Sequence, residues 1–337
     1  MSRIDDLVRD YRLLLLARNN SLVRDYTRRW YAIEQRLNAS YLGVAQEIAA
    51  LEAAGIVPNP ARIYELPQFR ALLEQARQEI SRFDRYVSGA IEQEQYLAWA
   101  DGIEYAAENI KQTYLANQMT AVTVPILDVE RVRVMLGLTQ TGTPLYNLLN
   151  ESYPETVTTL VSLLEDAMVQ GWNPRVTARK MADAMAGNLQ RAFTISRTEQ
   201  MRAHRIATVQ QYRTSQVVIR YRRRANLRGE TCLACLLQDG KVYELYEQFS
   251  DHPRGGCTCF AEMDGVPLPN VPSGRNYLLA LDRERQIRLM GEARYQAWVD
   301  GTVALDDMSR IHNHTVWGES PQIVPLKNLL PTNEVPV

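Results

Sequence analysis

The sequence predicts a mainly helical protein of the α+β class, with one small β module late in the chain. Two long stretches with apolar residues at helical spacing, on either side of residues 55–60, predict the helical part. An alternating, β-branched stretch at 217–224 predicts the first strand of the β module. All four cysteines of the chain follow that strand, between positions 232 and 259. The β module is therefore where the sequence concentrates its unusual chemistry.

The helical part begins with a very long amphipathic stretch. Apolar residues recur at steps of three and four over residues 4–53, which predicts one helix that the Asn19-Asn20 pair could interrupt. The turn "GIVPNP" ends it, and the same spacing resumes over residues 67–117. Two long helices joined by a short turn pack antiparallel, so residues 1–120 are predicted to form a helical hairpin. Its surplus aromatic residues form either its core or a surface for another chain.

The remaining chain is predicted in three parts. Residues 121–152 are expected to be a linker with short helices, residues 153–263 a helical domain that carries the β module, and residues 264–337 a tail. Asn173 and Pro174 are expected to begin a helix, as its N-cap and first-turn residues. Further helices are expected at 128–136, 143–150, 154–170, 188–215, 275–299 and 304–311, and the last twenty residues are expected to be extended.

The β module is predicted to contain a hairpin. In "LLQDGKVYEL" the pair Asp239-Gly240 has the composition of a two-residue hairpin turn between strands. "GGCTCFAEM" predicts a further short strand. The hairpin would lie between the two cysteine pairs and bring them together.

The cysteines form two pairs with the spacing of metal ligands. Cys232 and Cys235 form C-x2-C, Cys257 and Cys259 form C-x-C, and His252 precedes Cys257 by five residues. Zn²⁺ prefers four tetrahedral nitrogen or sulfur ligands, and residues i and i+2 of a strand share a face. We therefore predict a structural Zn²⁺ held by the four cysteines, with His252 as an alternative ligand.

Two other interpretations of the cysteines stay open. The pairs could form disulfides once the protein leaves the cytosol, or remain free thiols in the core of the module. A catalytic zinc is disfavoured because four thiolates leave no position for water. A redox C-x-x-C is disfavoured because it expects a βαβ setting rather than a hairpin.

Composition predicts a protein without a membrane partner. Hydrophobic residues make up 46% and charged residues 23% of the 337 residues, as in ordinary globular proteins. The longest apolar run, Leu13–Ala17, is too short to cross a bilayer, and the N-terminus lacks the apolar core of a secretory signal. Synthesis in a cytosol is expected.

Positive charge is concentrated in one segment. The net charge is −1, yet residues 191–228 contain ten arginines and one acid. A local excess of this kind predicts an anionic partner, such as the phosphates of DNA. The candidate contact residues are Arg205, Arg213, Arg220, Arg222, Arg223, Arg224 and Arg228. The alternative is a solvated strand face, or pairing with acids of a neighbouring subunit.

The order of several motifs resembles a known family. "GWNPRVTARKMADAM", "RAFTISRTEQMRAHRIATVQQY", "ETCLACLLQDGKVYEL" and "HPRGGCTCF" follow one another as in the phage Mu F-like minor head proteins, also called phage head morphogenesis proteins. The resemblance covers about residues 155–330. The chain departs from the common H-P-x-C-x-C ending by two additional residues between Pro253 and Cys257.

The resemblance implies a minor capsid protein of a tailed phage, without enzymatic activity. Such a protein is made in the host cytoplasm and is located in the virion, in the head interior or at the portal vertex. Its implied partners are the portal protein, packaged double-stranded DNA and other head or scaffold proteins. Its implied role is structural, in head assembly and in DNA packaging or delivery. The helical hairpin of residues 1–120 lies outside the resemblance, and its surplus aromatic residues alone predict contact with the portal or another partner.

The "RTE" signature of the resemblance is interpreted as structural. Arg197 and Glu199 lie two residues apart on a helix and do not face each other, whereas Glu199 can reach Arg202 at i+3. We predict that Arg197, Glu199 and Arg202 form a buried or half-buried network that braces the helix against the β module.

A metal-assisted nuclease acting on phage DNA is the alternative function. The letters "HNH" occur at His312, Asn313 and His314. In HNH nucleases, however, the corresponding residues are dispersed through a ββα fold rather than contiguous. The sequence therefore favours the structural role.

Overall fold

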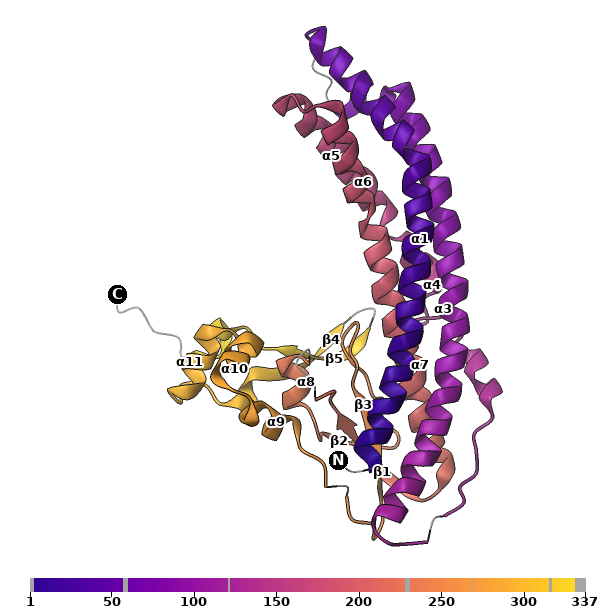
Figure 1. The fold of residues 1–337 in the computed structure, drawn as a ribbon, viewed down its shortest axis with the longest axis vertical. Coiled ribbons are helices and arrows are strands. Elements are labelled where there is room, and N and C mark those ends of the chain that lie inside the picture. The colour runs from indigo at the N-terminus through magenta and orange to yellow at the C-terminus, as the bar shows by residue number, and fades with distance from the viewer. Residues whose placement is uncertain are drawn as a thin grey trace. The chain divides into compact units, whose positions relative to one another are not determined.

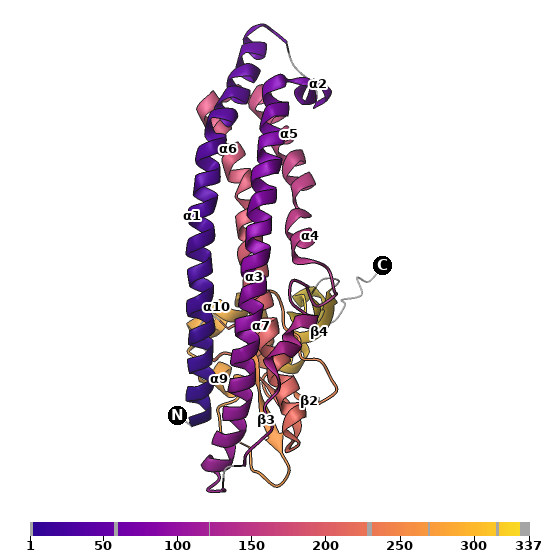
Figure 2. The ribbon, with the colours of Figure 1, turned by 90° about the vertical axis from the view of Figure 1, so that its right-hand side faces the viewer.

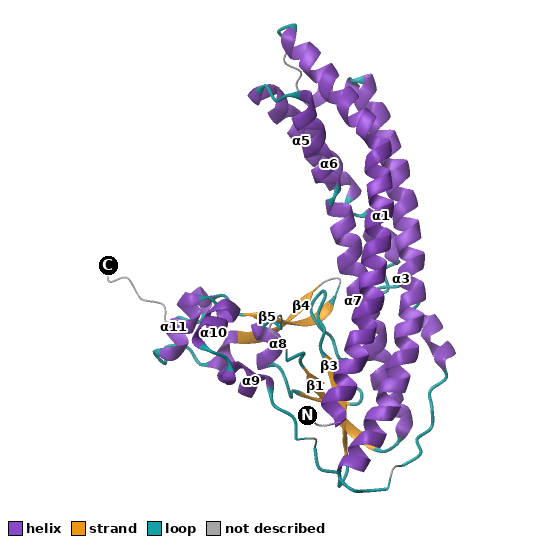
Figure 3. Ribbon diagram, viewed as in Figure 1, coloured by secondary structure: helices purple, strands orange, loops and turns teal. Residues whose placement is uncertain are grey.

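The computed structural model describes residues 3–56, 60–120, 122–227, 231–268, 270–314 and 317–330 (Figure 1). It is mainly helical with small antiparallel sheets, which confirms the predicted fold class (Figure 3). None of the described helices is long and apolar enough to cross a membrane. The chain divides into two compact units, each assembled from separated segments. The domains predicted with boundaries at 120, 152 and 263 are continuous stretches of chain, whereas each of these units combines stretches that are separated in the sequence.

The second unit, Ala17–Gln93 with Gly142–Arg197, contains most of the helical hairpin. Helices α1 (Arg3–Ala53) and α3 (Pro67–Ala116) lie side by side (Figure 2). Hydrogen bonds between the two helices pair rising residue numbers in α1 with falling numbers in α3. Asp25 accepts from Tyr86, Arg36 donates to Glu79, and Ser40 donates to Gln75. The antiparallel hairpin is therefore confirmed. The Asn19-Asn20 pair does not interrupt α1, because the apolar stripe continues on both sides of it and packing outweighs local propensity.

Shorter helices complete the second unit. These are α2 (Pro60–Glu65), α4 (Leu145–Asn150), α5 (Tyr153–Gln170), α6 (Pro174–Met185) and the start of α7 (Gly187–Ser215). The predicted cap of α6 is present, since the Asn173 side chain accepts a hydrogen bond from the Arg175 amide at 2.9 Å. Gly171 closes α5 with a left-handed φ of 63°.

The first unit, Met1–Leu16 with Glu94–Thr141 and Thr198–Val337, contains the β module. Its three-stranded antiparallel sheet has the order β2-β1-β3, with β1 (Val218–Arg224) between β2 (Val242–Glu244) and β3 (Thr258–Met263). Tyr221 of β1 stacks on Tyr243 of β2 at 5.3 Å. These rings share a core with residues from the ends of α3 and α7. The sheet therefore packs its apolar face on helices within the same unit.

The predicted Asp239-Gly240 hairpin is wrong. The residues before the turn form a short helix, α8 (Leu233–Leu237), instead of a strand, and β2 pairs with β1. Gly240 has a φ of 82°, as a turn requires. The Asp239 carboxylate, however, forms hydrogen bonds outside the turn. It accepts hydrogen bonds from the amides of Ala225 at 2.6 Å and Gly274 at 2.7 Å. The turn thus joins a helix to a strand.

The tail also differs from its prediction. The expected helix at 275–299 is three helices, α9 (Gly274–Ala280), α10 (Arg283–Met290) and α11 (Glu292–Val299). Asp282 caps the start of α10, and Gly291, with a φ of 81°, separates α10 from α11. The helix expected at 304–311 is the short 3₁₀ helix η2 (Leu305–Met308).

A hairpin in the tail was not predicted. It consists of β4 (Ser309–His314) and β5 (Gly318–Ile323). A last 3₁₀ turn, η3 (Leu326–Asn328), follows it, and η1 (Val129–Val134) takes the place of the helix expected at 128–136. The prediction for the last twenty residues lies partly outside the described part of the chain.

Candidate metal centre

The first two candidate ligands lie at the start of α8. Cys232 is the N-cap of this helix, and its sulfur accepts a hydrogen bond from the amide of Cys235 at 3.4 Å. Cys235 lies in the first turn and is buried. A C-x2-C sequence that begins a helix therefore presents both sulfurs to the same side, as metal ligation requires.

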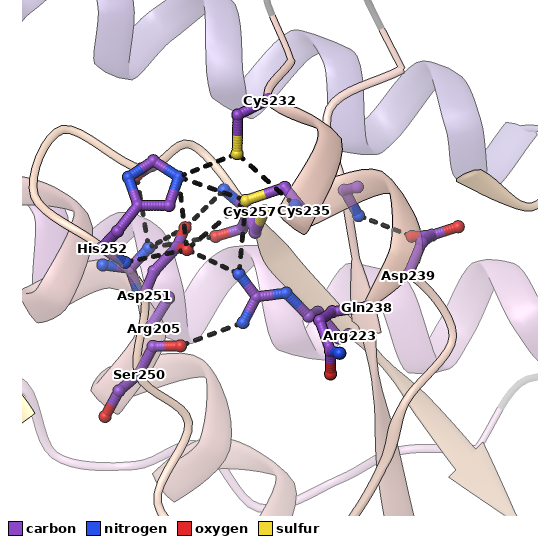
Figure 4. A network of polar contacts seen from close by, with 12 residues as sticks. Arg205, Arg223, Cys232, Cys235, Gln238, Asp239, Ser250, Asp251, His252 and Cys257 are labelled. Carbon is purple, nitrogen blue, oxygen red and sulfur yellow. Dashed lines mark hydrogen bonds and ion pairs between the residues drawn. The ribbon is translucent and has the colours of Figure 1, made fainter. Parts of the chain in front are cut away.

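His252 joins this pair from the loop before β3 (Figure 4). Its Nε2 atom lies 3.4 Å from the sulfur of Cys232 and 3.2 Å from that of Cys235. Its Nδ1 atom lies 2.9 Å from the carbonyl oxygen of Pro253. A proton on Nδ1 donated to that carbonyl leaves the Nε2 lone pair directed at the sulfurs, which is the usual arrangement of a ligating histidine.

Cys257 lies on the buried side of the same cluster. Its sulfur, the Cys235 sulfur and a carboxylate oxygen of Asp251 all lie within 4.8 Å of one another. Cys232, Cys235 and His252 form a second group with the same property. The two groups share Cys235, so three thiols, one imidazole and the Asp251 carboxylate form one buried cluster that could hold a metal ion.

Cys259 belongs to neither group. It lies on β3 opposite Arg223 and is fully buried in the core of the β module. Burial raises the pKa of its thiol above the ordinary value. The predicted i, i+2 alternation does not apply, because β3 begins at Thr258 and Cys257 lies before it. The geometry brings His252 to the cluster in place of Cys259.

The cluster is strongly polarised. Contact with Cys232 raises the pKa of His252 to about 9, although burial opposes this change. The hydrogen bonds to Cys235 and His252 lower the pKa of the Cys232 thiol. Burial alone would raise the pKa of Asp251, but the guanidinium groups of Arg223 and Arg205 lower it to about 2. All four cysteines carry free thiols.

Most of the arginines predicted to contact DNA are engaged inside the first unit. Arg205 and Arg223 are buried and pair with Asp251. Arg224 is buried and pairs with Asp5 and Asp239.

The other candidate arginines are closer to solvent. Arg220 and Arg222 both pair with Glu262 and are partly exposed. Arg213 is exposed and donates to the carbonyl of Leu245. Arg228 lies outside the described residues. The positive excess of residues 191–228 is therefore largely offset by acids from other segments.

The "RTE" signature lies in a buried network. The Glu199 carboxylate accepts bonds from Arg202 Nε at 2.7 Å and from Gln95 of α3 at 2.9 Å, and Arg202 also donates to the carbonyl of Leu138. Thr198 accepts a bond from the amide of Arg254, in the loop that carries His252, at 3.0 Å. In the structure Glu199 and Arg202 connect α7 to α3, while Thr198 contacts the loop that carries His252. Arg197 falls in the second unit.

The literal "HNH" residues do not form a site. His312, Asn313 and His314 are consecutive on β4, where neighbouring side chains point to opposite faces. Among the described residues, neither potential metal group contains them.

Sequence reasoning assigned no role to Asp251, the residue at the centre of the cluster. Its carboxylate accepts bonds from the amides of His252 at 3.0 Å and Cys257 at 3.1 Å, besides its two arginine partners. One feature of the sequence could have indicated such an acid: residues 191–228 contain ten arginines and one acid. If those arginines are buried, carboxylates from other segments must pair with them. Nothing local to "DHPRGG" distinguished this acid from others.

Comparisons with protein-family models, curated proteins and solved structures found no match to this chain.

Proposed function

We propose that this chain is a structural minor head protein of a tailed phage that binds the portal protein during head assembly. One observation carries the proposal beyond the motif resemblance: the motif residues serve as internal connectors of one unit. Glu199 and Cys235 are each less than 4% exposed, and both bond to other segments: Glu199 to Gln95 of α3, and Cys235 to Asp251 in the loop before β3. A catalytic motif would leave its polar groups facing a substrate, whereas these groups hold the fold together.

A structural Zn²⁺ is part of this proposal. Cys232, Cys235, Cys257 and His252 supply the donor types that Zn²⁺ prefers, and four protein ligands leave no position for a reacting water. The ion would tie α8 to the loop before β3. The strands of the sheet are only three to seven residues long, so a cross-link of this kind would stabilise the module.

DNA contact is a weaker part of the proposal. It would depend on Arg213, Arg220 and Arg222, which retain surface exposure. Phosphate neutralisation by so few arginines predicts weak binding that is lost between low and moderate salt.

The test is co-expression with the portal protein of the same phage. We expect the two proteins to co-elute in size-exclusion chromatography at a fixed ratio, the chain to be present in purified heads by mass spectrometry, and one zinc per chain by elemental analysis. Absence from heads together with no portal binding would refute the proposed role. Cleavage of DNA in Mg²⁺ or Mn²⁺ that His252→Ala or His312→Ala abolishes would instead establish the nuclease.

A further inference from the structure

Two guanidinium groups are buried against a single carboxylate beside the metal-site sulfurs. Arg205 and Arg223 are 3% and 0% exposed, and Asp251 between them is 3% exposed. Arg223 Nη2 lies 2.5 Å from one carboxylate oxygen of Asp251, and Arg205 Nη1 lies 3.3 Å from the other. Among the described residues, no other carboxylate is within ion-pair distance of either guanidinium.

This cluster carries an uncompensated positive charge. Two arginines and one aspartate sum to one net positive charge in a buried location. An isolated buried charge costs several kcal/mol even after relaxation, on the order of a typical domain's whole stability. In the neighbouring cluster Arg224 pairs with Asp5 and Asp239, and Arg12 donates to the carbonyl oxygen of Arg224 at 2.7 Å. Two arginines and two aspartates sum to zero, so this cluster is no source of the missing negative charge.

The sulfur ligands lie where the missing charge is needed. Arg223 Nη2 is 3.7 Å from the sulfur of Cys235. Arg205 Nη1 donates to the carbonyl oxygen of Cys257 at 3.2 Å (Figure 4). Three thiolates and one neutral imidazole around a divalent ion carry one net negative charge. That charge balances the arginine cluster, whereas a site with four thiolates would exceed it.

The aspartate also sets the shape of the ligand loop. Its carboxylate accepts bonds from the amides of both His252 and Cys257, so the loop wraps around it. Gly255 lies against the same carboxylate: a Cβ atom there would be 2.3 Å from an Asp251 oxygen. The charged group that neutralises part of the arginine pair therefore also positions two of the four ligands.

We infer that Arg205, Arg223 and Asp251 are positioning residues of the metal centre. Their net charge favours one divalent ion bound by Cys232, Cys235, Cys257 and His252. Cys259 is not a ligand of this ion. The inference rests on the proposed structural metal site. It also gives Arg205 and Arg223, two of the arginines predicted to contact DNA, a role in the metal centre instead.

The test measures Co²⁺ and Zn²⁺ binding to the full-length purified chain. We expect Arg223→Gln and Arg205→Gln to weaken binding about 10- to 100-fold, as removal of outer-shell partners does. Arg220→Gln is the matched control, because this arginine is on the same strand but pairs with Glu262 near the surface. Arg223→Lys keeps the positive charge and should recover part of the affinity.

The cobalt spectrum gives a readout that folding alone does not change. Cys257→Ser should remove about a third of the sulfur-to-cobalt charge-transfer intensity, since it removes one of three thiolates, while Cys259→Ser should leave the spectrum intact. Equal affinity of wild type, Arg223→Gln and Arg220→Gln would overturn the inference, and so would loss of intensity in Cys259→Ser. A wild-type chain that binds neither ion would refute the metal site itself. If the arginine variants do not fold, the two cysteine variants still decide the ligand set.

Discussion

Single residues show where burial opposes charge. In the first unit, Asp251 stays ionised because two arginines face it. In the second unit, Asp84 of α3 is 2% exposed, and one of its carboxylate oxygens has no hydrogen-bond partner among the described residues. Burial raises the pKa of Asp84 to about 7, although Arg191 partly opposes this change. The aspartate carboxyl group is thus a strong acid at position 251, whereas at position 84 its pKa is close to 7.

This difference predicts how stability depends on pH. Because the pKa of Asp84 is higher in the folded state, its contribution is fully present below the unfolded pKa of about 4 and is lost as pH rises through about 7. Asp84→Asn should abolish that loss and stabilise the protein at pH 8 by at most about 4 kcal/mol. Urea unfolding between pH 4 and 8 measures this, with the exposed Asp166→Asn as control. An unchanged pH profile in Asp84→Asn would contradict it.

Which side chains lie in the candidate metal cluster was also decided at the scale of residues. The sequence correctly singled out Cys232, Cys235 and Cys257 as neighbours and named His252 as an alternative. The sequence could not show that His252, rather than Cys259, lies in the cluster with the other cysteines, because this depends on where β3 begins. Asp251 could not be singled out at all, since its partners come from α7 and β1.

At the scale of elements, the long helices followed their apolar spacing closely. Helices α1 and α3 begin and end within a few residues of their predicted limits. The predicted short helices α4 and α6 are also present, but several short elements of the β module and the tail did not follow local signals. The Asp239-Gly240 pair predicted a hairpin, but Cys232 caps a helix just before it. Local turn chemistry specifies a turn without specifying what precedes it.

Helix contact inside the first unit depends on one glycine of α3. A Cβ atom at Gly102 would lie 2.4 Å from the carbonyl oxygen of His204 and 2.8 Å from Cβ of Ala207, both on α7. Gly102→Ala should therefore destabilise the protein by roughly 1–3 kcal/mol, despite the better helix propensity of alanine.

The matched control is Gly89 of the same helix, where an added Cβ would have no atom within 4 Å. Gly89→Ala should stabilise the protein by up to about 1 kcal/mol. Thermal unfolding of both variants measures the difference, and equal shifts of the same sign would contradict the close helix contact.

At the scale of the whole molecule, the chain is two units built from interleaved segments. Helices α1, α3 and α7 each contribute residues to both units. The candidate metal site lies entirely in the first unit. Its effect on stability is therefore expected to be regional.

Removal of the metal tests this expectation. After treatment with a chelator, the amides of residues 231–263 should exchange hydrogen markedly faster, because the loops lose their common cross-link. The amides of residues 17–93 should be unaffected. Hydrogen-exchange mass spectrometry measures both regions. Uniform acceleration, or none, would contradict a regional structural role.

The sequence by itself determined the helical class, the long hairpin, the place of the β module and the gathering of cysteines beside His252. These features depend on periodicity and spacing, which are local properties of the chain. Only the tertiary structure decided that Cys259 lies apart, that Asp251 is central and that most of the predicted DNA-contact arginines are engaged inside the fold. Those outcomes depend on which distant segments become neighbours, because a buried charge is stable only where another part of the chain supplies its partner.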